Sequence, residues 1–253
     1  MKSLNRFSAP CARISLAVLL FVTAPATLWA QDDEGPAQIN IRLVDVKPGS
    51  NAEWQAAIAE VAAASEAAGW PFYHVYQRLR GPNLPTYSII TPGGATNDLP
   101  PRDIDQSVFD RLGHSQNGNA LMTVLFYPEL GISTGSVAPS GEFMSVRVRT
   151  VSPSNRQAYF DWHANELTPA AREGGVTDLR SGRVAVGGNT NTFVRFYYGD
   201  TPQSAPAGGG NIGQSMNQRD FQRMIANEAS LIVADEMYLY RFREDLSFTA
   251  AGQ

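Results

Sequence analysis

The fold is decided by Ile39–Trp54, INIRLVDVKPGSNAEW, read together with Met144–Tyr159, MSVRVRTVSPSNRQAY. When the two stretches are superposed, Arg42 falls on Arg147, and both stretches begin with an alternation of apolar and other residues. Such an alternation predicts a strand with one apolar face. Because internal similarity at a fixed shift is the signature of a repeat, the sequence predicts a chain built from two copies of one unit.

A helix is predicted directly after each of these strands. Both strands are followed by Pro and then by a serine with an acid or amide three positions later, Ser50 with Glu53 and Ser154 with Gln157. This spacing is that of a capping box, in which the two side chains satisfy backbone N–H groups at the start of a helix. Each helix is expected to end at the next glycine along the chain.

Each copy then continues in the same order. Two strands around a turn are followed by a helical stretch and a last strand, over 72–90, 104–117 and 120–130 in the first copy and 179–198, 218–234 and 236–246 in the second. The order β-α-β-β-α-β is that of a ferredoxin-like unit, which leaves one face of its sheet uncovered. We therefore predict an α+β fold of two ferredoxin-like βαββαβ repeats, whose antiparallel sheets pair into a pseudo-twofold α+β barrel with the helices outside.

The predicted organisation is a first repeat over 37–130, a linker over 131–141 and a second repeat over 142–250. In the second repeat, the segment FDWHANELTPAAREGG, with Tyr159 before it, resembles the first helix found across the dimeric α+β barrel superfamily. The resemblance is to the tandem form of that superfamily, and it covers residues 37–250. Members include quinol-type monooxygenases, haem-binding chlorite dismutase-like and peroxidase-like proteins, and EthD-like and NIPSNAP-like proteins. The resemblance implies the fold and leaves the function open, because one fold hosts many activities.

Residues 1–30 are expected to be a secretory signal peptide. Lys2, Arg6 and Arg13 precede the apolar run ISLAVLLFV, and small residues then lead to an acidic QDDEG. The run is too short to span a membrane, and this order is typical of a signal peptide that is cut near Ala30. The mature protein is therefore expected to be periplasmic or secreted.

The composition excludes several classes of function. Residues 1–30 contain the single cysteine, Cys11, and three basic residues, so 223 residues remain with 17 Lys and Arg against 24 Asp and Glu, a net charge of −7. A chain this acidic, with no basic cluster, is a poor partner for nucleic acid. The lack of cysteine excludes thiolate catalysis, cysteine-bound zinc and iron–sulfur clusters. No other apolar segment is long enough for membrane insertion.

The histidines predict no metal site built from protein ligands. His74, His114 and His163 are scattered along the chain and show neither H-x-x-x-H nor H-E-x-x-H spacing. Haem needs one axial histidine only, so haem stays open as an alternative, although no cofactor is expected.

His163 is the candidate for chemistry in the first helix of the second copy. It lies beside an apolar helical stripe, with Tyr159 and Trp162 to one side and Glu166 three residues on. One interpretation is a half-buried core histidine that bonds to Glu166 or to a backbone carbonyl. The other is a haem ligand or an acid–base group, with Glu166, in a pocket between helix and sheet. A helix break at Thr168–Pro169 would open space there.

A second set of candidate residues comes from strand alternation. The apolar residues expected to face the helices are Ile39, Ile41, Leu43, Val146 and Val148. The opposite faces would then line the barrel interior, and in register they would bring together Arg42, His74, Tyr76, Arg78 and Arg147. Their guanidinium groups could recognise a carboxylate or another anion. Alternatively, these polar side chains tie the two sheets together.

The function predicted from the sequence is that of an exported protein that binds a small apolar or aromatic ligand in a pocket of the barrel, without an evident catalytic set. The expected ligand-binding residues are Arg42, His74, Tyr76, Arg78, Arg147, Tyr159, Trp162 and His163. One alternative is a cofactor-independent monooxygenase-like or haem-dependent enzyme that uses His163. Another is a protein-interaction module of the envelope. Oligomerisation beyond the intramolecular pseudo-dimer is left open.

Overall fold

The computed structural model of this chain describes residues 37–80, 87–93, 104–132, 141–207 and 210–250. The predicted signal peptide lies outside these residues, as does most of the predicted linker. The elements of the first half are β1 (Ala37–Val46), α1 (Asn51–Ala67), β2 (Phe72–Arg80), β3 (Tyr87–Pro92), α2 (Gln106–Ser115) and β4 (Gln116–Phe126). Those of the second half are β5 (Phe143–Val151), α3 (Arg156–Trp162), the π-helical turn η3 (His163–Leu167), α4 (Thr168–Glu173), β6 (Leu179–Val186), β7 (Thr192–Gly199), α5 (Gln218–Leu231) and β8 (Ile232–Phe242).

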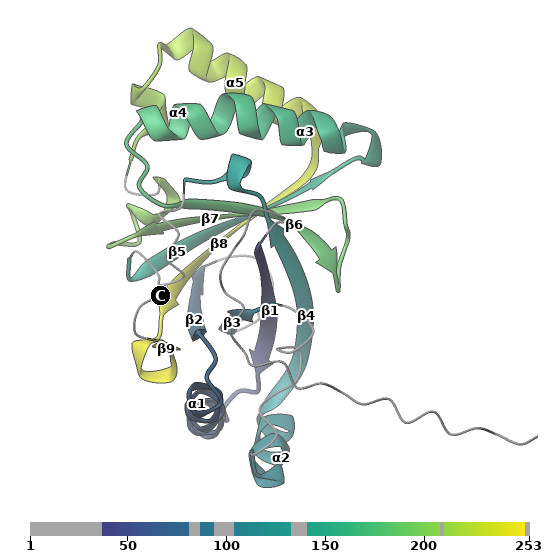
Figure 1. Ribbon diagram of the computed structural model, residues 1–253, viewed down its shortest axis with the longest axis vertical. Coiled ribbons are helices and arrows are strands. Elements are labelled where there is room, and N and C mark those ends of the chain that lie inside the picture. The colour runs from purple at the N-terminus through teal and green to yellow at the C-terminus, as the bar shows by residue number, and fades with distance from the viewer. Residues whose placement is uncertain (1–36, 81–86, 94–103, 133–140, 208–209, 251–253) are drawn as a thin grey trace, which may run out of the picture. The chain divides into compact units, whose positions relative to one another are not determined.

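The eight long strands form one antiparallel sheet that closes on itself (Figure 1). The strand order is β3-β1-β4-β6-β7-β5-β8-β2, and β2 also pairs with β3. Two pairings join the halves, β4 with β6 and β2 with β8. A short strand, β9 (Phe248–Thr249), adds to the start of β2. The α+β class and the antiparallel sheet predicted from the sequence are confirmed.

The inner face of the closed sheet is filled by apolar and aromatic side chains. Its buried cluster draws members from all eight long strands and none from a helix. Ile41 and Val146 belong to this cluster, and Ile39, Leu43 and Val148 pack against it. The prediction that these five residues face the helices is therefore wrong. The alternation predicts the strands correctly. A closed sheet of this size must also fill its interior with side chains, and here the apolar faces of the strands fill it.

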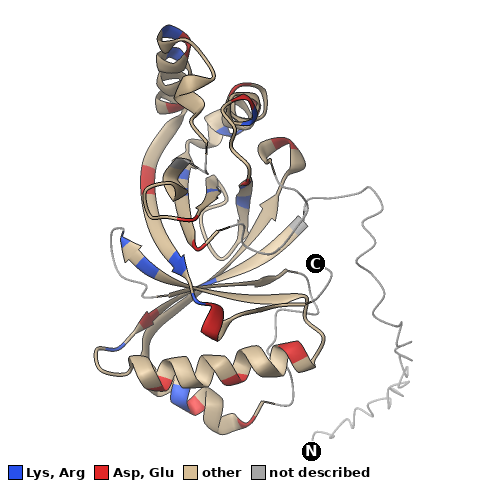
Figure 2. Ribbon diagram, turned by 90° about the vertical axis from the view of Figure 1, so that its left-hand side faces the viewer, with Lys and Arg blue, Asp and Glu red and all other residues tan. Residues whose placement is uncertain are grey.

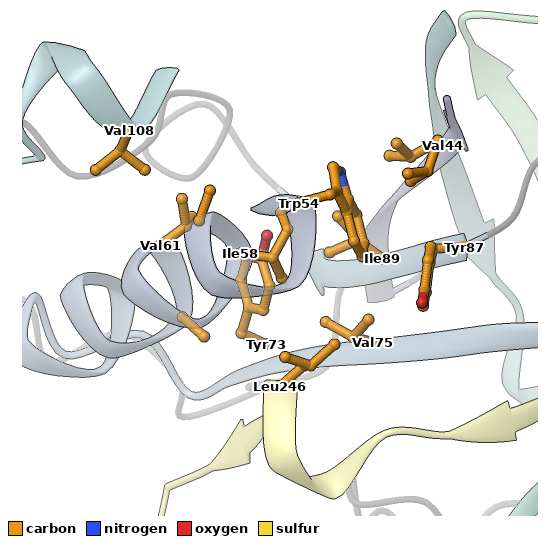
Figure 3. Close-up of a cluster of buried hydrophobic side chains, with 13 residues drawn as sticks. Val44, Trp54, Ile58, Val61, Tyr73, Val75, Tyr87, Ile89, Val108 and Leu246 are labelled. Atoms are coloured by element: carbon orange, nitrogen blue, oxygen red, sulfur yellow. The ribbon is translucent and has the colours of Figure 1, made fainter. Parts of the chain in front are cut away.

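The outer face of the first half is an apolar layer under α1. Trp54 stacks on Tyr87 with ring centroids 4.1 Å apart, and Ile58 and Val75 lie in the same buried cluster (Figure 3). Burying a side chain of this kind contributes about 1.5–3 kcal/mol, so this layer holds the helix on the sheet. The chain leaves α1 through Gly69, whose φ of 79° is a left-handed conformation that favours glycine, as the sequence predicts.

Neither predicted capping box forms. The Ser50 side chain makes no cap hydrogen bond, and its ψ of 9° lies outside the extended region typical of a capping residue. In the second half, Ser154 lies inside a 3₁₀ turn and its hydroxyl is 2.9 Å from that of Ser152. Gln157 donates to Asp161 at 2.8 Å instead of reaching back. The turn that begins at each preceding proline leaves the serine in a near-helical conformation, which points its side chain away from the helix start.

The helices α3, α4 and α5 lie over the outer face of β5–β8 (Figure 1). Tyr159 and Trp162 of α3 and Met224 of α5 form a buried cluster with Phe193 of β7. Acidic and basic residues are spread over helices and strands and gather on no single element (Figure 2). No helix in the described ranges is both long and apolar enough to cross a membrane.

Candidate functional site

The outer face of the second half carries buried charged groups where that of the first half is mostly apolar. Along β7 the side chains alternate, so Arg195 faces the helices while Val194 and Phe196 face the ring interior. Arg195 pairs in register with Ser181 of β6 and with Arg147 of β5. Directly paired residues of an antiparallel sheet share a face, so these three side chains leave the sheet on the same side.

Two buried arginines share one carboxylate of α5. Glu228 Oε1 accepts from Arg149 Nε at 3.0 Å and from Arg195 Nη2 at 2.9 Å, and Arg149 also pairs with Asp235. The side chains of Arg149, Arg195 and Glu228 are only 2%, 5% and 8% exposed. Arg195 Nη2 also donates to the Tyr159 hydroxyl at 2.9 Å. This network ties α3 and α5 to strands β5 and β7 of the sheet.

His163 is buried in the π-helical turn above this sheet. Its Nδ1 lies 3.2 Å from Thr168 Oγ1, and its Nε2 has no hydrogen-bond partner among the described residues. Burial, reinforced by the positive charge of Arg195, holds the pKa of His163 well below its usual value, so the ring is neutral. Tyr159 and Trp162 lie beside it, with ring centroids 6.3 and 6.0 Å from that of the imidazole.

Two expectations for this helix are corrected by the structure. Glu166 does not bond to His163, because its carboxylate accepts from Asn227 Nδ2 at 3.4 Å. The helix does not break at Thr168–Pro169 but widens into the π-turn, where the Thr168 N–H donates to the carbonyl of His163. Pro169 has no N–H, and its ring would clash with the carbonyl four residues back, so a wider turn relieves both problems. Such π-turns are frequent at functional sites.

Several buried polar atoms of this layer lack a hydrogen-bond partner within the described part of the chain. They are His163 Nε2, Arg195 Nε, Ser145 Oγ and Ser181 Oγ. Ser145 pairs in register with Tyr197, so it lies one row away from Arg195 on the same face. Buried polar groups of native proteins are nearly always bonded to protein, water or ligand. The layer bounded by α3, η3 and the sheet β5–β7 is therefore the candidate functional site, and we call it the polar layer.

The first half offers no comparable set in its described residues. Its helix–sheet layer is the apolar cluster around Trp54 and Ile58, in which Trp54 Nε1 is the atom without a partner. When the two copies are superposed so that Arg42 falls on Arg147, Ile58 corresponds to His163. The candidate site is therefore a feature of the second half.

Three of the five residues predicted to share the barrel interior do lie on the inner face. Tyr76 belongs to the interior cluster, and His74 and Arg78 lie two residues to either side of it on β2. His74 is buried, with Nε2 2.8 Å from Thr249 Oγ1. Burial, with a smaller contribution from the charge of Arg180, lowers the pKa of His74 to about 3. His74 is therefore a neutral, hydrogen-bonded residue of the interior.

Arg42 and Arg147 lie on the outer face instead. Arg42 pairs in register with Ile89, a member of the apolar cluster under α1, and Arg147 pairs with Arg195 in the polar layer. The prediction that all five residues meet in one interior site is wrong, because the apolar neighbours of these two arginines occupy the interior. Arg42 lies on the outer face of the first half and Arg147 on the outer face of the second half, so the two arginines do not share one site.

Arg195 and Glu228 were not predicted from the sequence. Arg195 gives a usable signal, because it is the one charged residue in the apolar strand TFVRFYYG, and a buried arginine persists only with a partner. Glu228 gives no such signal, since it is one of several polar residues on an amphipathic helix. Its role depends on α5 lying across the sheet, which local patterns do not reveal.

Other polar clusters are weaker candidates because their charges are already paired. In the ring interior, Arg180 pairs with Asp178 at 2.9 Å. A surface depression beside the end of β8 contains the ion pair between Arg241 and Glu142 at 2.6 Å. Within the residues that the structure describes, no three His, Cys, Asp or Glu side chains form a group that could hold a metal ion.

Haem does not fit the polar layer as it is arranged. His163 Nε2 is an atom that a haem iron could take as its axial ligand. The rings beside it are held in place, however, since Trp162 Nε1 donates to the Met224 carbonyl at 3.2 Å and Tyr159 is bonded to Arg195. A macrocycle against Nε2 would have to displace these buried rings.

Solved structures share this fold, although no protein-family model and no curated protein match the sequence. A candidate monooxygenase from Lactobacillus acidophilus has a TM-score of 0.56 and 13% identity, covering 85% of this chain and 97% of its own. An anthrone oxidase-like protein has a TM-score of 0.57 and 11% identity, over 87% of this chain and 95% of its own. A candidate monooxygenase from Fusobacterium nucleatum has a TM-score of 0.56 and 13% identity, over 87% and 97%.

The likeness to these solved structures concerns the α+β fold alone. The superfamily resemblance seen in the sequence is compatible with this fold and stays a prediction. At 11–13% identity the likeness assigns neither a substrate nor a cofactor to this chain. What this chain binds or does therefore depends on the residues of its own site.

Proposed function

We propose that this protein binds a small molecule in the polar layer of its second half. The observation that carries the proposal is the set of four buried polar atoms without partners among the described residues, which come from helix and sheet. The residues of two of them, His163 and Arg195, lie beside the same two aromatic residues. Arg195 contacts Tyr159 directly and lies with its guanidinium carbon 5.6 Å from the Trp162 ring centroid, and His163 lies beside both rings. A ligand that bonded these atoms would remove their desolvation cost, about 1–3 kcal/mol for each atom.

The layer combines apolar walls with a few polar groups, as small-molecule sites usually do. Trp162 and Tyr159 supply aromatic surface, while Ser145 and Ser181 supply hydroxyl groups that can donate or accept. His163 is neutral, so one of its ring nitrogens can accept a proton or a hydrogen bond. These features suit a small ring-bearing ligand with at least one polar substituent.

A second candidate function is proton abstraction from a bound substrate, as in a cofactor-independent monooxygenase-like enzyme. The observation that favours it is again His163, whose neutral imidazole has its Nε2 unbonded among the described residues. A general base needs such an atom within hydrogen-bond reach of the substrate. Two of the similar structures are named as candidate monooxygenases, but their likeness to this chain concerns the fold alone.

We also propose that the two halves are tandem ferredoxin-like repeats, related by a pseudo-twofold axis of the closed sheet, and that the mature protein is periplasmic or secreted. The matching element order of 37–126 and 143–242 supports the repeat. The basic start and short apolar run of residues 1–30 support export. An N-terminal sequence of the protein recovered from cells that begins near Gln31 is the result expected, and an intact Met1 would contradict export.

The site is tested by replacing His163 with Ala and, as a control, the exposed His114 with Ala. Phenol, benzamide and benzoate are titrated into each protein by calorimetry. We expect H163A to weaken binding of the probes at least tenfold and H114A to leave it unchanged. If H163A lowers the melting temperature while binding stays the same, His163 is a core residue and the proposal is wrong. The absence of binding of all three probes to the wild-type protein contradicts it as well.

Catalysis and haem have separate tests. Oxygen uptake in the presence of a hydroquinone, abolished in H163A and retained in H114A, is expected for the second candidate function, and no uptake in the wild-type protein excludes it for this substrate class. After reconstitution with haem, no Soret band above that of free haem is expected, and a shifted band that H163A abolishes would contradict the fit argued above.

A further inference from the structure

Two arginines lie directly opposite each other in the polar layer. Arg147 of β5 and Arg195 of β7 are register partners and leave the sheet on the same face. Like charges in this position repel each other and destabilise a sheet. Arg195 has Glu228 as a partner, whereas Arg147 makes no ion pair within the described residues. The pair is therefore short of one negative charge.

The charges on β5 and β7 lead to the same result. The positive groups on this face of β5 and β7 are Arg147, Arg149 and Arg195, and the carboxylates bonded to them are Glu228 and Asp235. The remaining carboxylate of the covering π-turn, Glu166, is bonded to the Asn227 amide and lies within ion-pair distance of no described arginine. On these two strands, three positive charges against two negative ones leave an excess of one positive charge.

The unbonded atoms around this excess charge are donors. Arg195 Nε–H can only donate, and the hydroxyls of Ser181 and Ser145 can donate as well. Ser181 is the register partner of Arg195 on one side, while Ser145 lies two residues before Arg147 on the strand at the other side. A carboxylate accepts well from such a set, in which the charged guanidinium of Arg195 stands beside neutral hydroxyl donors.

The position of Arg147 also provides access from solvent. Arg195 is buried, but Arg147 is half-buried, and the next residue in the same row is Met237 of β8, which is 40% exposed. A ligand could therefore place its anionic group between the two arginines from the β8 side of the layer. The buried end of the layer, with His163 and Trp162, would receive the rest of the ligand.

We infer that the ligand of the polar layer is a monoanion of the carboxylate type, held by Arg147 and Arg195 with help from Ser145 and Ser181. This inference rests on the proposed ligand site and adds the chemical class of its ligand. An anion would balance the excess charge and bond the donors, whereas a neutral isostere would satisfy the donors only.

The test compares benzoate with benzamide, which have nearly the same shape and differ by one charge. Calorimetric titration of the wild-type protein is expected to show at least tenfold tighter binding of benzoate. In R147M the preference should disappear, because the half-buried Arg147 supplies the excess charge. R42M is the matched control, since Arg42 occupies the corresponding strand position of the first half, and it should keep the full preference. The doubly substituted S145A/S181A protein should bind benzoate at least fivefold more weakly.

The possible results separate this inference from the proposed function. If both probes bind equally, or benzamide binds more tightly, the layer binds ligands but the anionic class is wrong. If R42M and R147M lose the preference to the same extent, the charge that matters is not located at Arg147 and the inference is also wrong. If neither probe binds to the folded wild-type protein, both the inference and the proposed function are overturned.

Discussion

Glu228→Gln removes one negative charge from the middle of the second half and changes the shape of the side chain very little. Burial alone would raise the pKa of Glu228, but Arg195 and Arg149 outweigh burial and hold the pKa below its usual value, so the group is ionised at neutral pH. After the change, Arg149 keeps its ion pair with Asp235, whose side chain is 44% exposed. Arg195 keeps only the hydroxyl of Tyr159 and that of Tyr197.

The expected loss follows from these remaining partners. Removing one member of a buried ion pair costs about 3–5 kcal/mol, because the other charge is left without compensation. Only one of the two arginines loses its single anionic partner here, so we expect the lower end of that range, about 3 kcal/mol. For a domain of this size, 1 kcal/mol changes the melting temperature by about 2–4 °C. The melting temperature of E228Q should therefore fall by roughly 6–12 °C.

The measurement is urea denaturation at neutral pH, followed by circular dichroism, with E173Q as the control. Glu173 is exposed on α4 and has no ion pair among the described residues, so E173Q should stay within about 0.5 kcal/mol of the wild type. Because the pKa of Glu228 is depressed in the folded state, its contribution is present above the unfolded pKa and is lost as the pH falls through the folded pKa. The difference in the free energy of unfolding between E228Q and wild type should therefore become smaller in acid. If the free energies of unfolding of E228Q and wild type differ by less than about 1 kcal/mol at neutral pH, the network of Glu228 with the two arginines does not stabilise the protein as argued.

Two further predictions concern pH and sheet closure. The folded pKa of His163 is depressed, so the unfolded chain binds the proton more readily and the wild-type protein loses stability below pH of about 6.5. Between pH 6.5 and 4.5, H163Q should therefore lose less stability than wild type in urea titrations, and an equal loss in the two proteins would contradict a buried, neutral His163. Gly187 and Gly49 both have φ near +80°, but a Cβ at Gly187 would meet the Leu121 carbonyl oxygen of β4, and one at Gly49 would meet nothing. In urea denaturation G49A should cost about 1–2 kcal/mol and G187A clearly more; equal costs would contradict the β4–β6 contact.

Local patterns in the sequence predict the elements well because their causes are local. The alternation in INIRLV and MSVRVR gives strands, and the glycines after α1 and α4 adopt the left-handed conformation that ends a helix. Alternation cannot say which side of a strand is the interior. In this fold both sides of a strand are buried, one under helices and one inside the ring. The alternation predicts correctly that Ile41 and Arg42 lie on opposite faces, but Ile41 lies inside the ring and Arg42 on the outer face, the reverse of the prediction.

The candidate site was predicted only in part because its members come from six separate elements, α3, η3, α5, β5, β6 and β7. Tyr159, Trp162 and His163 are close in sequence, and their aromatic setting is visible there. Arg195 and Glu228 are brought to them by the pairing of β5 with β7 and by the path of α5 across the sheet. The bonding of Glu166 was predicted wrongly for the same reason, since its partner on α5 lies 61 positions along the chain.

The closure of the sheet has a consequence for how the chain folds. Each half supplies two strands, β2 and β4 or β6 and β8, whose outer edges are paired only by the other half. Some of the contacts that complete the ring join residues far apart, such as Gln77 with Arg243 at a separation of 166 positions. Such long-range closure forms slowly, and until it does, two strand edges per half are open to pairing with other chains. An isolated half should therefore associate with copies of itself, and the covalent link between the halves gives the correct partner a high effective concentration during folding.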